Sequence, residues 1–298
     1  MDTQAIRLGA VSVYPGEKSG KYPDGNQVMV RGADTLAAFD TPLVANRLGS
    51  ELLDADLVIL GHVHEDHMAG LHRLWHAPLY VHEADVAAAR SWEGMARHYG
   101  YAPEVLPGMR TKIEQEFHYA PRPDAQAYQD GASWNLGGGV TVRAVHMPGH
   151  TSGHCVLLVE PGGIAFIGDI DLSSFGPYYG DATSSLAEFR RTLEAVKDIP
   201  AKVWITSHHK GVITERETFL ALLKAFASRL DAREAAIADY LRQWPSTLAE
   251  LAAHRFVYPA DRDDLYYEDA ERRTIGQHLE ALVLAGRIVE EGGCWRAA

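Results

Sequence analysis

The segment GHVHEDHMAG, residues 61–70, constrains this chain more than any other stretch of its sequence. It directly follows the apolar run LVIL at 57–60, which is typical of a short buried strand. His62 and His64 leave the C-terminal end of that strand two residues apart, so we expect both imidazoles to point to the same face. Two imidazoles on one face can share a metal ion. The segment therefore predicts a metal site at a strand end.

Asp66 and His67 extend this pattern beyond the point where the strand ends. A turn can carry them to a second position nearby, so the spacing favours two ions over one. Two histidines alone are common on surfaces and in cores, but three histidines and an aspartate within six positions are hard to explain without a metal. A loop this short cannot fill two coordination spheres, so further ligands must come from elsewhere in the chain.

Three later segments repeat the arrangement of an apolar strand followed by His or Asp residues. They are 140–154, which ends in HMPGHTSGH, 164–169, which ends in GD, and 203–209, which ends in SHH. Each segment delivers its polar side chains at the C-terminal end of a strand. This recurrence, more than any single motif, predicts the site.

Composition is that of an ordinary globular protein and disfavours several partners. The 298 residues can bury a full core, 46% of them are hydrophobic and 23% charged, and the formal net charge is -12. This negative charge argues against general electrostatic binding of nucleic acid. There is neither a signal-peptide pattern nor a stretch of about 18 apolar residues, so we expect a cytoplasmic protein without a membrane partner. Cys155 and Cys294 predict neither disulfides nor a thiolate zinc site.

Four motifs, in the order HVHEDH at 62–67, PGHTSGH at 148–154, GD at 168–169 and SHH at 207–209, resemble those of the metallo-β-lactamase-fold hydrolase superfamily, in its dinuclear HxHxDH branch. The resemblance covers residues 5–225. It implies an α/β fold of the α+β type: an αββα sandwich, in which two mixed β-sheets pack face to face with helices outside. It also implies a dinuclear site along one edge of the sandwich.

The resemblance implies two divalent metal ions as cofactors. Zinc is the favoured metal, and iron and manganese are alternatives. The implied ligands are His62, His64 and His150 for the first ion, Asp66, His67 and His208 for the second, and Asp169 as the bridge. His209 is an alternative ligand to His208. We favour His208 because it follows a small residue, as the family ligand tends to do. His154 is expected to support the site by hydrogen bonding.

At two positions the sequence differs from the pattern of the family. Gly61 stands where the family usually has a hydroxyl residue, which puts a local hydrogen bond in doubt. Cys155 does not align with the cysteine ligand of the true β-lactamases, and the second set of ligands has Asp66 instead. Antibiotic hydrolysis is therefore not expected.

The implied reaction is hydrolysis by a hydroxide that bridges the two ions, because such ions acidify water towards a pKa of about 7. Asp66 would orient this hydroxide or move its proton. The predicted substrate is a small or medium molecule with a carboxylic ester, lactone, thioester or phosphoester bond. The alternatives are a glyoxalase-II-like thioesterase, an endoribonuclease or, from another class, a non-haem iron sulfur dioxygenase. The complete second set of ligands speaks against the mononuclear dioxygenase.

The loop after Asp169 must pass near the metals, and it carries Tyr178 and Tyr179. Either phenol is a candidate catalytic group that meets a substrate oxygen, and packing is the alternative for both. Asp171 is a weaker candidate. Residues 91–135 form an aromatic-rich insertion, interpreted either as a lid over the substrate or as a surface excursion with its own small core.

Residues 223–298 change to helical patterning and are predicted to form a second domain after a catalytic domain at 1–222. The elements expected around it are a helix capped by Thr214 and Glu217, a helix that stops near Pro245, a helix capped by Thr247 and Glu250, a helix at 269–284 and a hairpin at 287–295.

Three helices and a hairpin resemble a winged helix, which raises a nucleic-acid-binding module as a rival function. Residues 269–284 hold Arg272 and Arg273 but also three acids, and the hairpin tip carries Glu290 and Glu291. Neither surface favours phosphates. We therefore expect a small-molecule substrate and a packing or lid role for this domain, while nucleic-acid binding and a homo-oligomer stay open alternatives.

Overall fold

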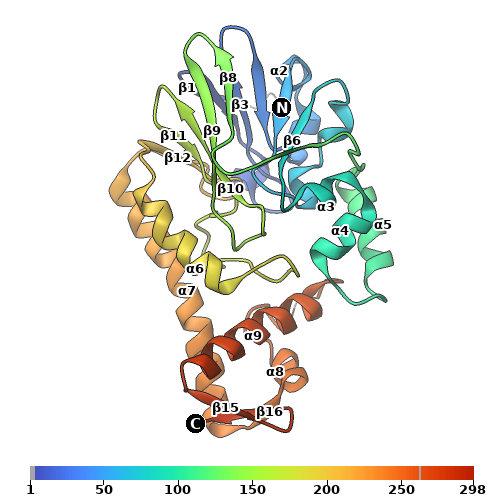
Figure 1. Cartoon of the computed structure of the whole chain (residues 1–298), viewed down its shortest axis with the longest axis vertical. Helices are drawn as coiled ribbons and strands as arrows, with labels where there is room; N and C mark the ends of the chain where they lie inside the picture. Colours follow the sequence, from blue (N-terminus) through green and yellow to red (C-terminus); the bar gives the residue numbers. More distant parts are fainter. Residues whose placement is uncertain (1–3, 262) are drawn as a thin grey trace.

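The computed structural model describes residues 4–261 and 263–298, in which two β-sheets pack face to face between helices (Figure 1). This is the αββα arrangement that the resemblance to the family implied. A third, smaller sheet lies at the C-terminal end of the chain.

The first sheet has the strand order β1-β2-β3-β4-β5-β6-β7. Its strands are β1 (Ile6–Leu8), β2 (Val11–Tyr14), β3 (Gln27–Arg31), β4 (Leu36–Phe39), β5 (Leu57–Ile59), β6 (Leu79–His82) and β7 (Gln126–Tyr128). From β1 to β4 neighbours pair antiparallel, whereas β4, β5, β6 and β7 pair in parallel. Parallel strands end at the same edge of a sheet, so the residues that follow β4, β5 and β6 meet there.

The second sheet has the order β13-β12-β11-β10-β9-β8. Its strands are β8 (Ser133–Gly137), β9 (Val140–His146), β10 (Cys155–Glu160), β11 (Ile164–Phe166), β12 (Val203–Ile205) and β13 (Val212–Ile213). Here β11 and β12 pair in parallel, and β10 pairs antiparallel with β9 and β11. The residues after β11, those after β12 and the β9–β10 connection therefore lie at one edge.

Apolar side chains from both sheets fill the space between them and fix where each strand ends. Phe39 of β4 and Phe166 of β11 meet across this layer with ring centroids 5.9 Å apart. The buried residues around them include Val11, Val28, Ile59, Val142, Leu157 and Ile205. A slip of one residue would move a whole side-chain set to the wrong face, so this layer also sets the position of the residues that follow each strand.

Helices cover the outer faces of both sheets. Along the chain they are α1 (Glu17–Gly20), η1 (Leu43–Arg47), α2 (Ser50–Leu53), η2 (Glu65–His67), η3 (Leu71–Arg73), α3 (Val86–Arg90), α4 (Trp92–Tyr99), α5 (Leu106–Glu116), α6 (Leu186–Ala195) and η4 (Val196–Asp198). Helix α4 is capped by the Ser91 side chain, which accepts a hydrogen bond from the N–H of Gly94. Residues 91–135 contribute Phe117 to the core and Tyr99 to a cavity wall, and their role as a lid stays a prediction.

Helix α7 (Arg216–Gln243) is one continuous helix of 28 residues, where the sequence pattern predicted two. Neither glycine nor proline occurs in these residues, so nothing in the sequence breaks the helix. Its N-cap is Glu215 without a side-chain hydrogen bond, so the capping box expected from Thr214 and Glu217 is absent at this described helix start. The predicted domain boundary after residue 222 falls inside α7.

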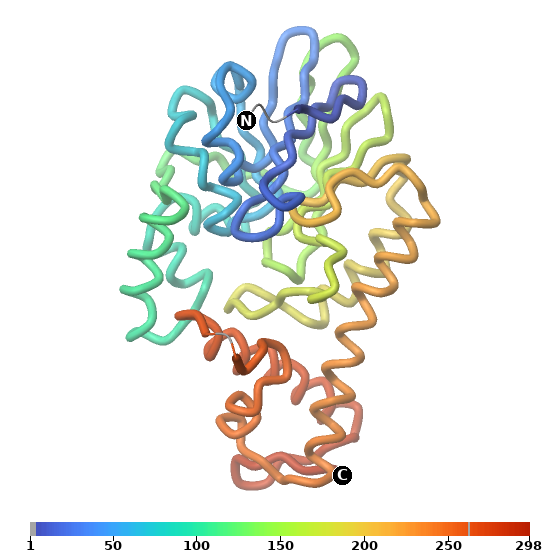
Figure 2. Tube along the Cα trace, turned by 180° about the vertical axis from the view of Figure 1, so that it is seen from behind, coloured from blue at the N-terminus to red at the C-terminus, as the bar shows by residue number. Residues whose placement is uncertain are grey.

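The C-terminal unit, residues 237–298, lies at one end of the molecule beyond the long α7 (Figure 2). It contains α8 (Leu248–His254), α9 (Tyr267–Leu284), β14 (Ser246–Thr247), β15 (Ile288–Glu291) and β16 (Cys294–Ala297). The predicted hairpin and the capping box of Thr247 and Glu250 are confirmed. The likeness to a winged helix stays a prediction. None of the described helices is long and apolar enough to cross a membrane.

Candidate metal centre

Three imidazole nitrogens face one another where the strands end. His62 Nε2, His64 Nδ1 and His150 Nε2 lie 3.1 to 3.2 Å apart, and Asp169 Oδ2 lies 3.4 Å from His150 Nε2. Ligands placed tetrahedrally about 2.0–2.1 Å from a zinc ion are about 3.3 Å from one another. The spacing of this first cluster therefore suits a small divalent cation.

A second cluster lies beside the first and shares Asp169 with it. Asp66 Oδ2 is 3.0 Å from His208 Nε2, and Asp169 Oδ1 is 3.2 Å from His67 Nε2 and 3.6 Å from His208 Nε2. The two oxygens of Asp169 thus face different clusters. The structure brings together all seven residues that were proposed as ligands from the sequence.

The donors fit a metal because two central atoms lack any hydrogen-bond partner. Among the described residues, His67 Nε2 and Asp169 Oδ1 are buried and lie 3.2 Å apart, but neither atom makes a hydrogen bond of good geometry. A buried polar atom without a partner costs about 1–3 kcal/mol, and more for a charged group. A cation between these atoms would satisfy both.

Two buried carboxylates orient metal-facing histidines from behind. Asp181 Oδ2 lies 2.7 Å from His64 Nε2, and Asp40 Oδ2 lies 2.7 Å from His67 Nδ1. Each carboxylate accepts the N–H of one ring nitrogen, which leaves the lone pair of the other nitrogen directed into the cluster. Asp40 Oδ1 also accepts the backbone N–H of Gly61 at 2.7 Å, so the loop is anchored there without the hydroxyl usual in the family.

Backbone carbonyls orient two other imidazoles in the same way. His208 Nδ1 lies 2.8 Å from the carbonyl oxygen of Asp24, and His150 Nδ1 lies 3.0 Å from that of Tyr178. These contacts leave the Nε2 atoms of both rings free to face the clusters. The outer partners required of metal-binding histidines are therefore present for each of these rings.

His154 and Asp85 hold the loops rather than facing the clusters. His154 Nε2 accepts the backbone N–H of Asp169 at 3.2 Å, which is the supporting geometry that was predicted. Asp85 Oδ2 accepts hydrogen bonds from the N–H of Val63 at 3.2 Å and from the hydroxyl of Thr151 at 2.7 Å. Asp85 thus joins the loop after β5 to the loop between β9 and β10.

The histidines of the two clusters differ in charge: burial lowers the pKa of His62 and lowers that of His150 to about 3, so both rings are neutral, whereas carboxylates raise the pKa of two others. Burial lowers the pKa of His64, but the hydrogen bond and charge of Asp181 raise it overall to about 9. Burial also opposes protonation of His208, whose pKa the charges of Asp169 and Asp66 raise to about 10. Burial raises the pKa of Asp169, yet the surrounding histidines hold it well below its usual range. The carboxylates are thus ionised at neutral pH, and they attract protons or a metal cation.

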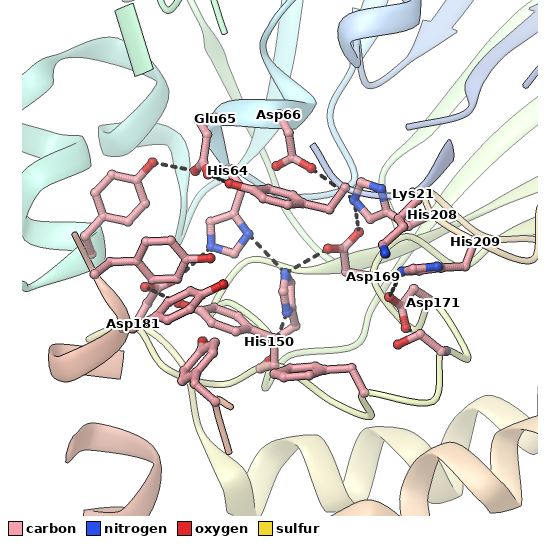
Figure 3. Close-up of a pocket in the computed structure, with 18 of the residues that line it drawn as sticks. Lys21, His64, Glu65, Asp66, His150, Asp169, Asp171, Asp181, His208 and His209 are labelled. Carbon is pink, nitrogen blue, oxygen red and sulfur yellow. Dashed lines mark hydrogen bonds and ion pairs between the residues drawn. The ribbon is translucent and has the colours of Figure 1, made fainter. Parts of the chain in front are cut away.

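The clusters open into a cavity of about 650 Å³. Figure 3 shows His150 between His64 and Asp169, with Asp181 on one side of the site and Lys21 on the other. A cavity of this size is in the range that holds small-molecule ligands.

The two candidate tyrosines have different positions. Tyr178 lines the cavity, and its hydroxyl donates to Asp181 Oδ1 at 2.9 Å. Tyr179 does not line it: the residue is 1% exposed and its hydroxyl lies 2.8 Å from His278 Nε2 on α9. The loop turns Tyr179 into the packing layer against α7 and α9, so its position does not support the predicted catalytic contact with substrate.

The two remaining candidates lie together at the cavity rim. His209 Nε2 is 3.7 Å from Asp171 Oδ2, and the geometry therefore places His208, not His209, at the second cluster. Asp171 lines the cavity, and burial raises its pKa to about 6.

The carboxylates that support the ligands were not predicted from the sequence. Asp40 directly follows β4, so the rule that parallel strands end at one edge could have selected it. Asp181 and Asp85 lie in connections without a local sequence signal. Glu65 lies inside the first motif, and it accepts hydrogen bonds from the hydroxyls of two tyrosines that line the cavity.

Known proteins are similar to this chain in sequence and in fold. The family described as the metallo-beta-lactamase superfamily matches residues 31–208. A beta-lactamase-like protein 2 homolog from Drosophila melanogaster is 26% identical over 255 residues, covering 84% of this chain and 77% of that protein. An atrochrysone carboxyl ACP thioesterase from Pseudocercospora fijiensis is 26% identical over 200 residues, covering 65% of this chain and 56% of that protein.

A solved structure shares the fold over nearly the whole length of the chain. A metallo-beta-lactamase family protein from Thermus thermophilus has a TM-score of 0.71 at 22% identity, and the match covers 98% of this chain and 99% of that one. The family match spans more than half of the chain and contains both clusters. The chain therefore belongs to the metallo-beta-lactamase superfamily.

Proposed function

We propose that this protein is a hydrolase that uses two divalent metal ions to cleave an ester-like bond of a small or medium molecule. One observation carries the proposal: two clusters of buried donors share the carboxylate of Asp169, and atoms between them lack hydrogen-bond partners within the described chain. The proposed ligands are His62, His64 and His150 for one ion, Asp66, His67 and His208 for the other, and Asp169 for both.

Bound ions would supply an acidified water and would polarise the carbonyl or phosphoryl group of the substrate. The protein supplies the groups around that water. Burial raises the pKa of Asp66, but the charges of His67 and His208 lower it overall, so the carboxylate is ionised at neutral pH. Asp66 also lines the cavity, where it can orient a water molecule or accept its proton. We assign it this role.

Among ester-like bonds, we favour the thioester. Two relatives of this chain carry the name thioesterase, and they are 26% and 29% identical over the matched parts. Carboxylic esters, lactones and phosphoesters share the same attack by water on a polarised centre, so they belong in the same assays. The net charge of -12 supports a small-molecule substrate over RNA.

The test is a metal analysis combined with a substrate panel. The purified protein should contain close to two zinc, iron or manganese ions per chain, and it should hydrolyse at least one thioester, lactone, carboxylic ester or phosphodiester. Asp169→Asn should lose metal from both clusters. Its hydrolysis rate should fall by more than roughly 10–100-fold, which is the loss typical when a residue that only orients a metal ligand is replaced.

A matched control is Asp198→Asn, which changes an exposed aspartate in η4. It should leave the metal content and the hydrolysis rate as in the wild type. Equal rates for the wild type and Asp169→Asn would refute the proposed mechanism.

A further inference from the structure

A row of stacked aromatic rings begins near the metal centre. Tyr99 at the end of α4 and Tyr101 just after it stack with ring centroids 5.1 Å apart and planes 4° from parallel. Tyr266, which precedes α9, stacks on Tyr101 at 6.0 Å and 18°. Three rings from two distant parts of the sequence therefore present nearly parallel planes.

The row continues through the C-terminal unit and returns to the loop that follows Asp169. Tyr267 meets the edge of Tyr266 at 5.0 Å and stacks on Tyr258 at 4.1 Å. Tyr258 then lies 5.8 Å from Phe175. All of these residues line the cavity, and together we call them the ring wall: Tyr99, Tyr101, Phe175, Tyr258, Tyr266 and Tyr267.

The polar ends of the first two tyrosines are already engaged. The hydroxyl of Tyr99 donates to Glu65 Oε2 at 2.6 Å, and that of Tyr101 donates to Asp181 Oδ1 at 2.7 Å. Tyr99 and Tyr101 are only 1% and 5% exposed, so these two rings support the wall from behind, and the ring surface that a ligand can reach belongs mainly to Tyr266, Tyr267 and Phe175.

The wall is held in place by two side chains of α9. Arg273 donates to the carbonyl oxygens of Tyr99 and Gly100 at 2.8 and 2.7 Å, which ties α9 to the end of α4. Glu271 is fully buried and accepts the backbone N–H of Tyr258 at 3.0 Å. These hydrogen bonds fix the backbone that carries the rings, and a preorganised surface loses little entropy on binding.

We infer that the ring wall binds a flat aromatic group of the substrate, and that the C-terminal unit is thereby part of the substrate site. The inference deepens the proposed function and rests on it for the bond that is cleaved: the substrate class is an aromatic ester or thioester. Flat rings pack on tyrosine in offset-stacked or edge-to-face geometry, which a saturated ring of the same carbon skeleton cannot reproduce. The cavity of about 650 Å³ has room for a two-ring group.

Charge decides against the other ligand that aromatic walls bind, an organic cation. Lys21 and Lys210 line the same cavity and would repel a cation. Five carboxylates line it too: the proposed ions would offset the charges of Asp66 and Asp169, Glu65 and Asp181 accept hydrogen bonds from phenols of the wall, and Asp171 lies beside His209. With both ions bound, the arrangement favours an uncharged or anionic aromatic group.

The test compares the binding of 2-naphthoic acid with that of decahydro-2-naphthoic acid to the full chain by calorimetry. Both acids carry the same carboxylate, so any contact with a metal cancels in the ratio. The wild type should bind the aromatic acid about tenfold more tightly. Tyr266→Leu keeps an apolar side chain but removes the ring, and it should reduce this ratio to less than about threefold at unchanged metal content. Tyr258→Leu is a second variant with the same expected result.

The matched control is Trp244→Leu, which removes a ring that is 60% exposed in the same C-terminal unit and does not line the cavity. It should keep the ratio of the wild type. Three results would overturn the inference. They are equal binding of both acids by the wild type, an unchanged binding ratio in both tyrosine variants, and tighter binding of benzyltrimethylammonium than of naphthoate. Because binding needs no turnover, a Tyr266-dependent ratio in a protein that hydrolyses no ester would support this inference while refuting the proposed function.

Discussion

The metal centre and the ring wall face the same cavity but are positioned by different means. The metal-facing residues follow β5, β11 and β12 or lie between β9 and β10, so backbone pairing of the sheets sets their positions. The rings come from the end of α4, from the loop near residue 175 and from the C-terminal unit, and side chains such as Glu271 and Arg273 hold them. The sheets thus fix the positions of the proposed metal ligands, whereas the loops and the C-terminal unit fix those of the rings.

Removal of the metal should have the largest effect, and it should affect the metal centre but not the ring wall. Treatment with a chelator should abolish hydrolysis and lower the Tm, since an ion at a thousand times its Kd stabilises a folded protein by about 4 kcal/mol. The ring wall contains no proposed ligand, so the preference for naphthoate over its saturated counterpart should persist. Calorimetry before and after chelation measures both effects, and loss of the preference together with the metal would show that the two regions are not separable.

Protons and metal ions should compete at the metal centre but not at the ring wall. The pKa of His64 is raised to about 9 and that of His208 to about 10, so both rings carry a proton at neutral pH that a metal must displace. Raising the pH removes this competitor, so metal affinity should increase by about tenfold per pH unit for each displaced proton. Titration against a chromophoric chelator between about pH 6 and about pH 8 measures the slope. A flat profile would contradict the assignment of these rings as ligands.

The metal centre could be predicted from the sequence because each ligand stands next to a strand that is itself recognisable. His62 and His64 follow an apolar run, and Asp169 and His208 follow two others, so local pattern indicated that these strand ends form one site, and the resemblance to the family motifs supplied the individual ligands. The same reasoning could not separate Tyr178 from Tyr179, because packing against α7 and α9 decides which ring faces the cavity.

The ring wall and the supporting carboxylates could not be predicted because they depend on contacts between distant segments. Tyr101 and Tyr266 are separated by more than half of the chain, and nothing local in either segment indicates that the rings stack. Asp181 meets His64 across 117 positions of sequence. The unbroken length of α7 was missed for a different reason: the apolar residues from Phe219 to Leu230 and those from Ile237 to Leu241 were assigned to separate helices, although neither glycine nor proline lies between them.

Asp181 contacts both regions, because its two oxygens bind His64 of the metal centre and Tyr101 of the ring wall. In Asp181→Asn the remaining oxygen can still accept the hydroxyl of Tyr101, but the amide N–H₂ must face His64, whose Nε2 needs an acceptor. We expect metal affinity to fall by about 10–100-fold, as for other outer partners of metal ligands, while the aromatic preference changes little. Chelator competition and naphthoate calorimetry measure the two effects on one protein, with Asp198→Asn as the control. An unchanged metal affinity would show that Asp181 does not orient His64.

Substitution of Glu271 should affect the ring wall alone, because this residue supports the wall and touches no proposed metal ligand. Its carboxylate accepts the backbone N–H groups of Phe256 at 2.6 Å, Val257 at 3.0 Å and Tyr258 at 3.0 Å. Glu271→Gln should lower the free energy of unfolding by about 2 kcal/mol, since one acceptor becomes a donor that faces these buried N–H groups. Urea unfolding measures this loss, and metal affinity should not change.

A second variant shows whether the effect of Glu271→Gln on ligand binding comes from the wall or merely from lower stability of the C-terminal unit. Thr247→Ala removes the capping box of α8 and should cost about 1 kcal/mol, but Thr247 does not line the cavity. If recognition depends on the position of Tyr258, Glu271→Gln should weaken the preference for naphthoate and Thr247→Ala should leave it intact. An equal loss in both variants would mean that the wall responds to the stability of the whole unit, and the hydrogen bonds of Glu271 would then have no particular role in recognition.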